Sequence, residues 1–76
     1  MPRFFFNHQS DRGPLDVDID GIKLESLNAA IEEASFAVKG AVALADEPTR
    51  GEFQIEDEGR VVLARVPYAV VDDEAD

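Results

Sequence analysis

RFFFNH, residues 3–8, is the stretch of sequence that decides the fold. Aromatic residues favour strands, and this run is too short to be the apolar region of a signal peptide, so we expect a first strand from Arg3 to about His8. Successive side chains of a strand point to opposite faces. Phe4, Phe6 and His8 therefore share one face, which predicts where the core lies, while Phe5 lies on the other.

A second strand is predicted from the alternation that follows. Residues 9–14 combine Ser, Asp, Gly and Pro, which is typical of a turn. In residues 15–22 the aliphatic side chains of Leu15, Val17, Ile19 and Ile22 alternate with three aspartates, a pattern that indicates a short half-buried strand ending at Gly21. This strand would pair with the first.

A helix is predicted from residue 27 to 45. Ser26 can accept a hydrogen bond from the first helical turn, and apolar residues then recur at helical spacing. A hairpin follows, in which Phe53 and Ile55 point inward and Gly59 takes the left-handed position of a three-residue loop. The returning strand, from Arg60 to about Tyr68, has three consecutive apolar residues at 61–63, so we expect a bulge there.

The elements together predict an α+β fold of order β-β-α-β-β, with an antiparallel sheet of about four strands and one helix packed on one face. Periodicity aims seven residues at one core: Phe4, Phe6, Ile31, Ala34, Val38, Phe53 and Ile55. We expect one compact domain over residues 1–71. The charged end, residues 72–76, is predicted to be a disordered acidic tail, because it has too few apolar groups to offset the entropy of ordering.

Composition excludes several classes of function. The 76 residues carry 17 acids and 7 bases, a net charge of −10, which repels phosphate backbones and anionic lipids, so we expect no nucleic-acid partner and no membrane partner. The chain has no cysteine, which is consistent with a cytoplasmic protein. No apolar run approaches the roughly 20 residues that a spanning helix needs. The residues indicate no cofactor.

The chain resembles a known family of short bacterial proteins, frequent in soil and plant-associated bacteria. The resemblance rests on the opening MPRFFF at 1–6, on DGI at 20–22 before an alanine-rich helix, and on the hairpin IEDEGR at 55–60. It covers about residues 1–67. That family is known only as a domain of unknown function, so the resemblance supports the fold and implies no activity.

Asp16, Asp18, Asp20 and Gly21 reproduce the start of a calcium-binding loop. An EF-hand also needs a bidentate acid at its twelfth position, which here is Leu27. We therefore predict no metal site and interpret the aspartates as the solvent-facing side of a strand. Binding of an ion or small ligand by these three aspartates stays the alternative function.

His8 is the only histidine, and with Ser10 and Asp11 it supplies the residue types of a hydrolase triad. A triad also requires each group within hydrogen-bonding reach of the next, and three residues of one short loop seldom converge in that way. We expect a structural histidine at the margin of the core, and predict that the protein has no catalytic residue and is not an enzyme.

The predicted contact residues lie on the helix opposite its core side, with one more on the sheet: Ala29, Phe36, Gly40, Ala43 and Phe5. Phe36 would be exposed among small residues, and Phe5 would lie on the sheet face that the helix leaves open. We therefore predict a cytoplasmic protein-interaction or regulatory module whose partner is itself, as a homodimer, or a basic protein.

Overall fold

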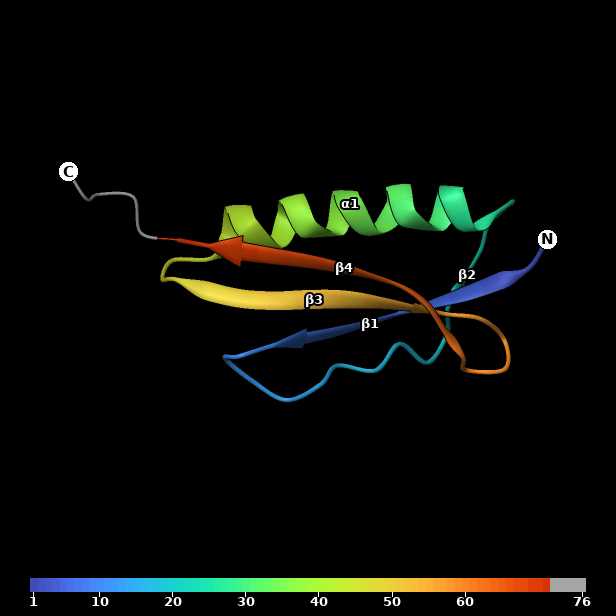
Figure 1. The fold of residues 1–76 in the computed structure, drawn as a ribbon, viewed down its shortest axis with the longest axis horizontal. Helices are drawn as coiled ribbons and strands as arrows, with labels where there is room; N and C mark the ends of the chain where they lie inside the picture. The colour runs from blue at the N-terminus through green and yellow to red at the C-terminus, as the bar shows by residue number, and fades with distance from the viewer. Residues whose placement is uncertain (72–76) are drawn as a thin grey trace.

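The computed structural model describes residues 1–71, in which four antiparallel strands form one sheet and one helix lies against it (Figure 1). The elements are β1 (Arg3–Ser10), β2 (Ile22–Lys23), α1 (Leu27–Leu44), β3 (Thr49–Glu56) and β4 (Val62–Val70). The strands lie in the order β2-β1-β3-β4 across the sheet. The predicted α+β fold and its β-β-α-β-β order are confirmed. The predicted acidic tail lies outside the described residues.

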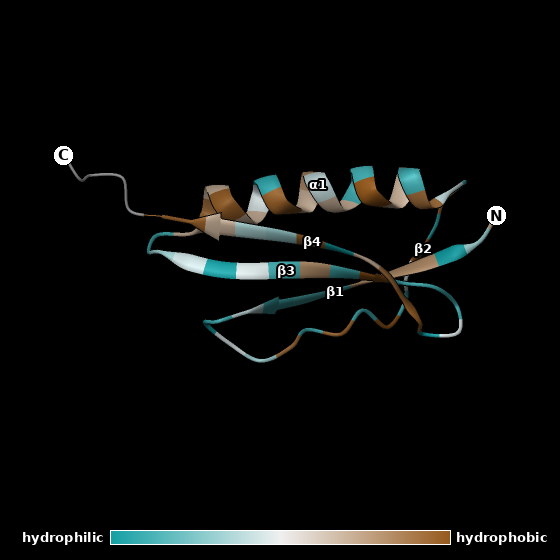
Figure 2. Ribbon diagram, in the orientation of Figure 1, coloured by the Kyte–Doolittle hydropathy of each residue, from teal (hydrophilic) through white to brown (hydrophobic). Residues whose placement is uncertain are grey.

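The core lies between α1 and one face of the sheet. Residue pairs in register place the inward side chains side by side, with Phe6 opposite Ile55 and His8 opposite Phe53. Four apolar residues are buried, Phe4, Ala30, Ala34 and Ile55, and seven more pack against them, Phe6, Leu24, Leu27, Ile31, Phe53, Ala64 and Val66. Six of the seven predicted core residues belong to this cluster; Val38 is half-buried outside it. Figure 2 shows apolar residues on the side of α1 that faces the strands.

The helix begins where the sequence predicts. Ser26 has an extended backbone, and its Oγ accepts a hydrogen bond from the backbone N–H of Ala29 at 3.2 Å. This bond satisfies one of the free amides of the first turn. The helix ends at Leu44, one residue before the predicted end, and Ala45 is its C-cap.

The hairpin between β3 and β4 differs from the prediction in its turn residue. Arg60, not Gly59, has the positive φ, at 65°. The N–H of Arg60 donates to the carbonyl of Asp57 at 2.9 Å, which closes a turn over residues 57–60 and moves the left-handed position one residue on. The predicted bulge is confirmed: Ile55 pairs with Ala64 and Glu56 with Val62, which leaves Leu63 as the extra residue.

The predicted strand over residues 15–22 is wrong in most of its length. Only Ile22–Lys23 pairs as a strand with β1, and before it only Asp16 forms a bridge, to His8. The carboxylate of Asp18 accepts from the backbone N–H of Phe6 at 3.0 Å, so a side chain occupies the place of a strand carbonyl. As a result Asp18 turns inward, and Ile19 is left 81% exposed.

No helix within residues 1–71 combines the length and apolar character needed to cross a bilayer.

Candidate functional site

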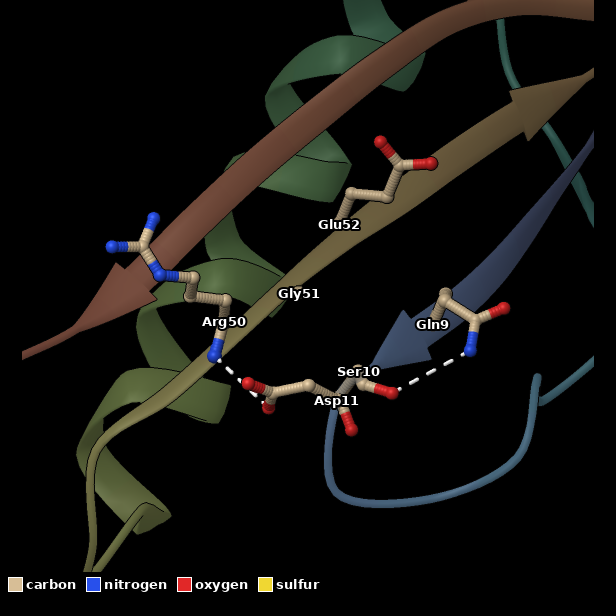
Figure 3. Close-up of a pocket in the computed structure, with 6 residues that line it drawn as sticks. All are labelled: Gln9, Ser10, Asp11, Arg50, Gly51 and Glu52. Atoms are coloured by element: carbon tan, nitrogen blue, oxygen red, sulfur yellow. Dashed lines mark hydrogen bonds between the residues drawn. The ribbon is translucent and has the colours of Figure 1, made fainter.

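A shallow pocket of about 410 Å³ lies where β1 ends and β3 begins (Figure 3). Its walls are Gln9, Ser10, Asp11, Arg50, Gly51 and Glu52. The carboxylate of Asp11 accepts from the backbone N–H of Arg50 at 3.2 Å, and the N–H of Asp11 donates to the carbonyl of Arg50 at 3.0 Å. Figure 3 shows the first of these bonds, which joins the residue after β1 to the start of β3. The groups around the pocket therefore bond the end of β1 to the start of β3.

His8, Ser10 and Asp11 do not form a triad. The Nε2 of His8 lies 2.7 Å from the hydroxyl of Tyr68, and the Oγ of Ser10 accepts from the backbone N–H of Arg12 at 3.2 Å. Within residues 1–71 no hydrogen bond joins the imidazole to Ser10 or Asp11. His8 has the structural place that the sequence predicts, at the margin of the core.

The surroundings of His8 form an aromatic cluster that the sequence does not reveal. The imidazole stacks on the ring of Phe53, with centroids 4.3 Å apart and an angle of 7° between the planes. Gly51 makes room for Tyr68, because a Cβ at Gly51 would lie 2.6 Å from the tyrosine hydroxyl. The cluster joins β1, β3 and β4, and only the strand register, Gly51 opposite Tyr68 and His8 opposite Phe53, could have predicted it.

Asp16, Asp18 and Asp20 do not converge on an ion. The two carboxylate oxygens of Asp18 accept from the backbone N–H groups of Phe6, at 3.0 Å, and of Gly21, at 3.1 Å. Within the described residues no group of three His, Cys, Asp or Glu side chains is placed to hold a metal. Asp18 acts as an anchor for the chain after β1, and no observation favours the ion-binding alternative.

The predicted contact residues of α1 lie together on the side away from the sheet. Phe36 is 67% exposed, Gly40 and Ala43 are exposed, and Ala29 is half-buried. We call the surface made by Ala29, Glu32, Phe36, Lys39, Gly40 and Ala43 the outer face of α1. The ammonium of Lys39 lies 5.5 Å from the centroid of the Phe36 ring.

A second shallow pocket, of about 380 Å³, runs along one flank of this outer face. Its walls are Ile31, Glu32, Ser35, Phe36 and Lys39. Glu32 and Lys39 bring opposite charges to it, and Phe36 brings the exposed apolar surface. From Ala34 to Ala45 the only charged residue is Lys39, although residues 1–71 hold 13 acids and 7 bases.

Phe5 lies on the sheet face opposite the helix, as predicted, but it is covered in part. The guanidinium of Arg60 lies over its ring, 3.9 Å from the centroid, and Gly21 approaches the ring edge. Arg60 also donates to the carbonyl of Asp18 at 2.9 Å. Phe5 is therefore part of an internal contact between the hairpin and the chain after β1.

The part of this opposite face that Arg60 does not cover carries a charged cross-strand pair, Glu52 and Arg65. The guanidinium of Arg65 lies 2.8 Å from the carboxylate of Glu52, and the side-chain amide of Gln54 donates to the same carboxylate at 2.8 Å. The hydrogen bond from Gln54, with Arg65, holds the pKa of Glu52 below its ordinary value, although burial acts in the opposite direction. This pair stabilises the β3–β4 ladder and has the exposure of a surface pair.

A family model described as "Domain of unknown function (DUF6894)" matches residues 3–69. No curated protein and no solved structure matches the chain. The match confirms the predicted resemblance to a small family of unknown function, whereas MPRFFF and IEDEGR as its signatures stay a prediction.

Proposed function

This chain belongs to the DUF6894 family of domains of unknown function, and we propose that it is a non-enzymatic cytoplasmic module that binds another protein through the outer face of α1. The observation that carries the proposal is Phe36, a large aromatic side chain 67% exposed at the centre of that face. Burying such a side chain contributes about 1.5–3 kcal/mol, and exposed aromatic residues are enriched in protein interfaces.

The surroundings of Phe36 support a contact surface rather than a chance exposure. Ala29, Gly40 and Ala43 on the outer face are small, so a partner can approach the helix closely at these positions. The flanking charges, Glu32 and Lys39, lie at the border, as the polar rim of a protein interface does. Interfaces gain most of their free energy from a few residues near their centre, surrounded by contacts that exclude water.

The exposed edge of the sheet offers a poorer surface. Of the two edge strands, β2 has only two residues, and β4 contains Pro67, which has no N–H to donate to an added strand. Arg65 places a charge on the same strand, and charges on edge strands also oppose pairing. A partner is therefore expected to bind by side-chain contacts on α1 rather than by extending the sheet.

The experiment compares the wild type with Phe36→Glu and a matched control, Ile19→Glu. Ile19 is 81% exposed and lies outside α1, so it gives the same change in charge at an exposed apolar residue elsewhere. Tagged proteins are used to capture partners from a lysate of the native host, followed by mass spectrometry. We expect a protein that the wild type and Ile19→Glu retain and Phe36→Glu loses. Equal retention by Phe36→Glu would refute this surface.

A further inference from the structure

The outer face of α1 is symmetric about Phe36 in its sequence. Ala29 and Ala43 lie seven residues before and after Phe36. Glu32 lies four residues before it, and Lys39 lies three residues after it. Apart from Gly40, the face therefore presents an alanine, a charge, the aromatic ring, the opposite charge and an alanine from either end.

The two charges lie on the same flank of the helix. At about 100° per residue, positions seven apart are displaced by only about 20° around the axis, and by about 10 Å along it. Both side chains line the 380 Å³ pocket beside Phe36. They are too far apart to pair with each other, and within residues 1–71 neither forms an ion pair. The flank is thus acidic at one end and basic at the other.

We propose, on the basis of the proposed function, that the partner of this face is a second copy of the chain, with the two α1 helices antiparallel about a two-fold axis at Phe36. In a two-fold contact, if residue i meets residue j of the partner, then j meets i. Phe36 then meets its own copy, and Glu32 of each chain lies beside Lys39 of the other. A parallel arrangement would instead place the two copies of Glu32 at the same level along the axis, with no Lys39 beside them.

Gly40 fits this arrangement and has no explanation within one chain. A Cβ at Gly40 would have no atom within 4 Å, and glycine is among the weakest helix formers. In the antiparallel register Glu33 of one helix lies opposite Gly40 of the other, on the flank away from the charged pair. The missing side chain leaves space for that glutamate.

The size of the contact predicts a weak dimer. The 18 residues of α1 give a helix about 27 Å long, so one helix pair buries less area than the roughly 1,200 Å² at which stable complexes begin. The dimer should therefore form at high micromolar concentration, and salt should weaken it because its charged pairs are exposed.

Charge reversal tests the register against the effect of net charge. Glu32→Lys makes this acidic protein less negative, so net charge alone would strengthen self-association. The register predicts the opposite, because two lysines would then meet at each end of the contact. We expect about tenfold weaker dimerisation for Glu32→Lys and for Lys39→Glu, measured by sedimentation equilibrium at low salt. Circular dichroism shows whether each variant is folded.

Restored pairs give the decisive outcomes. The double variant Glu32→Lys with Lys39→Glu should dimerise as the wild type does, and a mixture of the two single variants should form heterodimers. Glu58→Lys, in the exposed hairpin turn, is the control for net charge, and it should not weaken the dimer. Stronger or unchanged dimerisation by Glu32→Lys, or no recovery in the double variant, overturns the register.

A wild type that stays monomeric at high micromolar concentration overturns the second copy as the partner. That result leaves the proposed function standing if a captured protein is still lost with Phe36→Glu. Loss of the proposed function has a different signature, in which Phe36→Glu changes neither the mass nor the set of captured proteins.

Discussion

The two faces of the sheet are closed by different kinds of interaction. On one face α1 covers Phe4 and Ile55 through apolar contacts distributed over three strands and the helix. On the other face the chain between β1 and β2 is fixed by a few polar groups. Asp18 accepts from two backbone amides, Asn7 accepts from the N–H of Asp18 at 3.0 Å, and Arg60 covers Phe5.

The difference determines how each face responds to substitution. Apolar packing has no direction, so the cost of a change on the helix face should follow the buried volume that is removed. The face opposite the helix depends on a small number of polar groups, of which Asp18 and Arg60 each make two or more contacts. There the cost should depend on whether the substituted residue is one of these groups, and adjacent residues of the same type should differ sharply.

The largest effect is expected for Phe4→Ala on the helix face. Phe4 is only 5% exposed, and truncating a buried phenylalanine costs about 3–5 kcal/mol through lost burial and the cavity left behind. A domain of this length has roughly 4–11 kcal/mol of stability in total. Urea unfolding should therefore show a much lower midpoint for Phe4→Ala than for the wild type, because the loss is a large part of that total.

Phe36→Ala is the matched control, because the same truncation occurs at an exposed site. Its cost to the unfolding of the monomer should be under about 0.5 kcal/mol. Equal destabilisation by the two variants would mean that burial by α1 does not decide the stability of this face.

The helix face could be predicted from sequence because its signals are periodic. Alternation placed Phe4, Phe53 and Ile55 inward, and helical spacing placed Ala34 against them, as the structure confirms. Ala30, four residues before Ala34, follows the same helical spacing and is buried. Each signal is repeated several times along its element, so one ambiguous residue does not change the result.

The second prediction concerns Asp18, the main anchor of the opposite face. Asp18→Ala leaves the amides of Phe6 and Gly21 without their side-chain acceptor, at a cost of about 1.5–3 kcal/mol, since hydrogen bonds to a charged group are the stronger ones. Asp16→Ala and Asp20→Ala are the controls, because their side chains accept no hydrogen bond within residues 1–71. We expect both to stay within about 0.5 kcal/mol of the wild type in urea unfolding.

The same comparison explains why the opposite face was predicted poorly. The alternation in residues 15–20 is the pattern of a half-buried strand, yet Asp18 replaces the strand ladder with side-chain bonds and leaves the aliphatics outward. The contacts of Asp18 with β1 are not visible in the local sequence, because these partners are 12 residues away at Phe6 and 11 at Asn7. The position of Phe36 was predictable from spacing alone, whereas the cover of Arg60 over Phe5 was not.

Arg60→Gly is the third test, and its result is the sign of the change in the free energy of unfolding. Arg60 holds a positive φ of 65°, which glycine adopts more readily, so Arg60→Gly relieves backbone strain. The same change removes the guanidinium from Phe5, its bond to the carbonyl of Asp18 and its ion pair with Glu56. We expect the losses to exceed the gain by about 1 kcal/mol. A glycine variant that is more stable than the wild type in urea would show that Arg60 does not close this face.

The smallest effect on stability is expected at Glu52, on the part of the same face that Arg60 does not cover. Hydrogen bonding to Gln54 and the nearby Arg65 lower the pKa of Glu52 in the folded state. A carboxyl group with a lowered folded pKa contributes stability above its unfolded pKa, and this contribution is lost as the pH falls through the folded pKa. Glu52→Gln should therefore be slightly less stable than the wild type at neutral pH, by under about 1 kcal/mol for so exposed a pair, and the difference should vanish in acid. Urea midpoints measured from neutral pH to below the ordinary glutamate pKa test this, with Glu58→Gln as the control, since Glu58 has no ion pair within residues 1–71. A difference that persists unchanged in acid would show that Glu52 stabilises the sheet by packing and not by its charge.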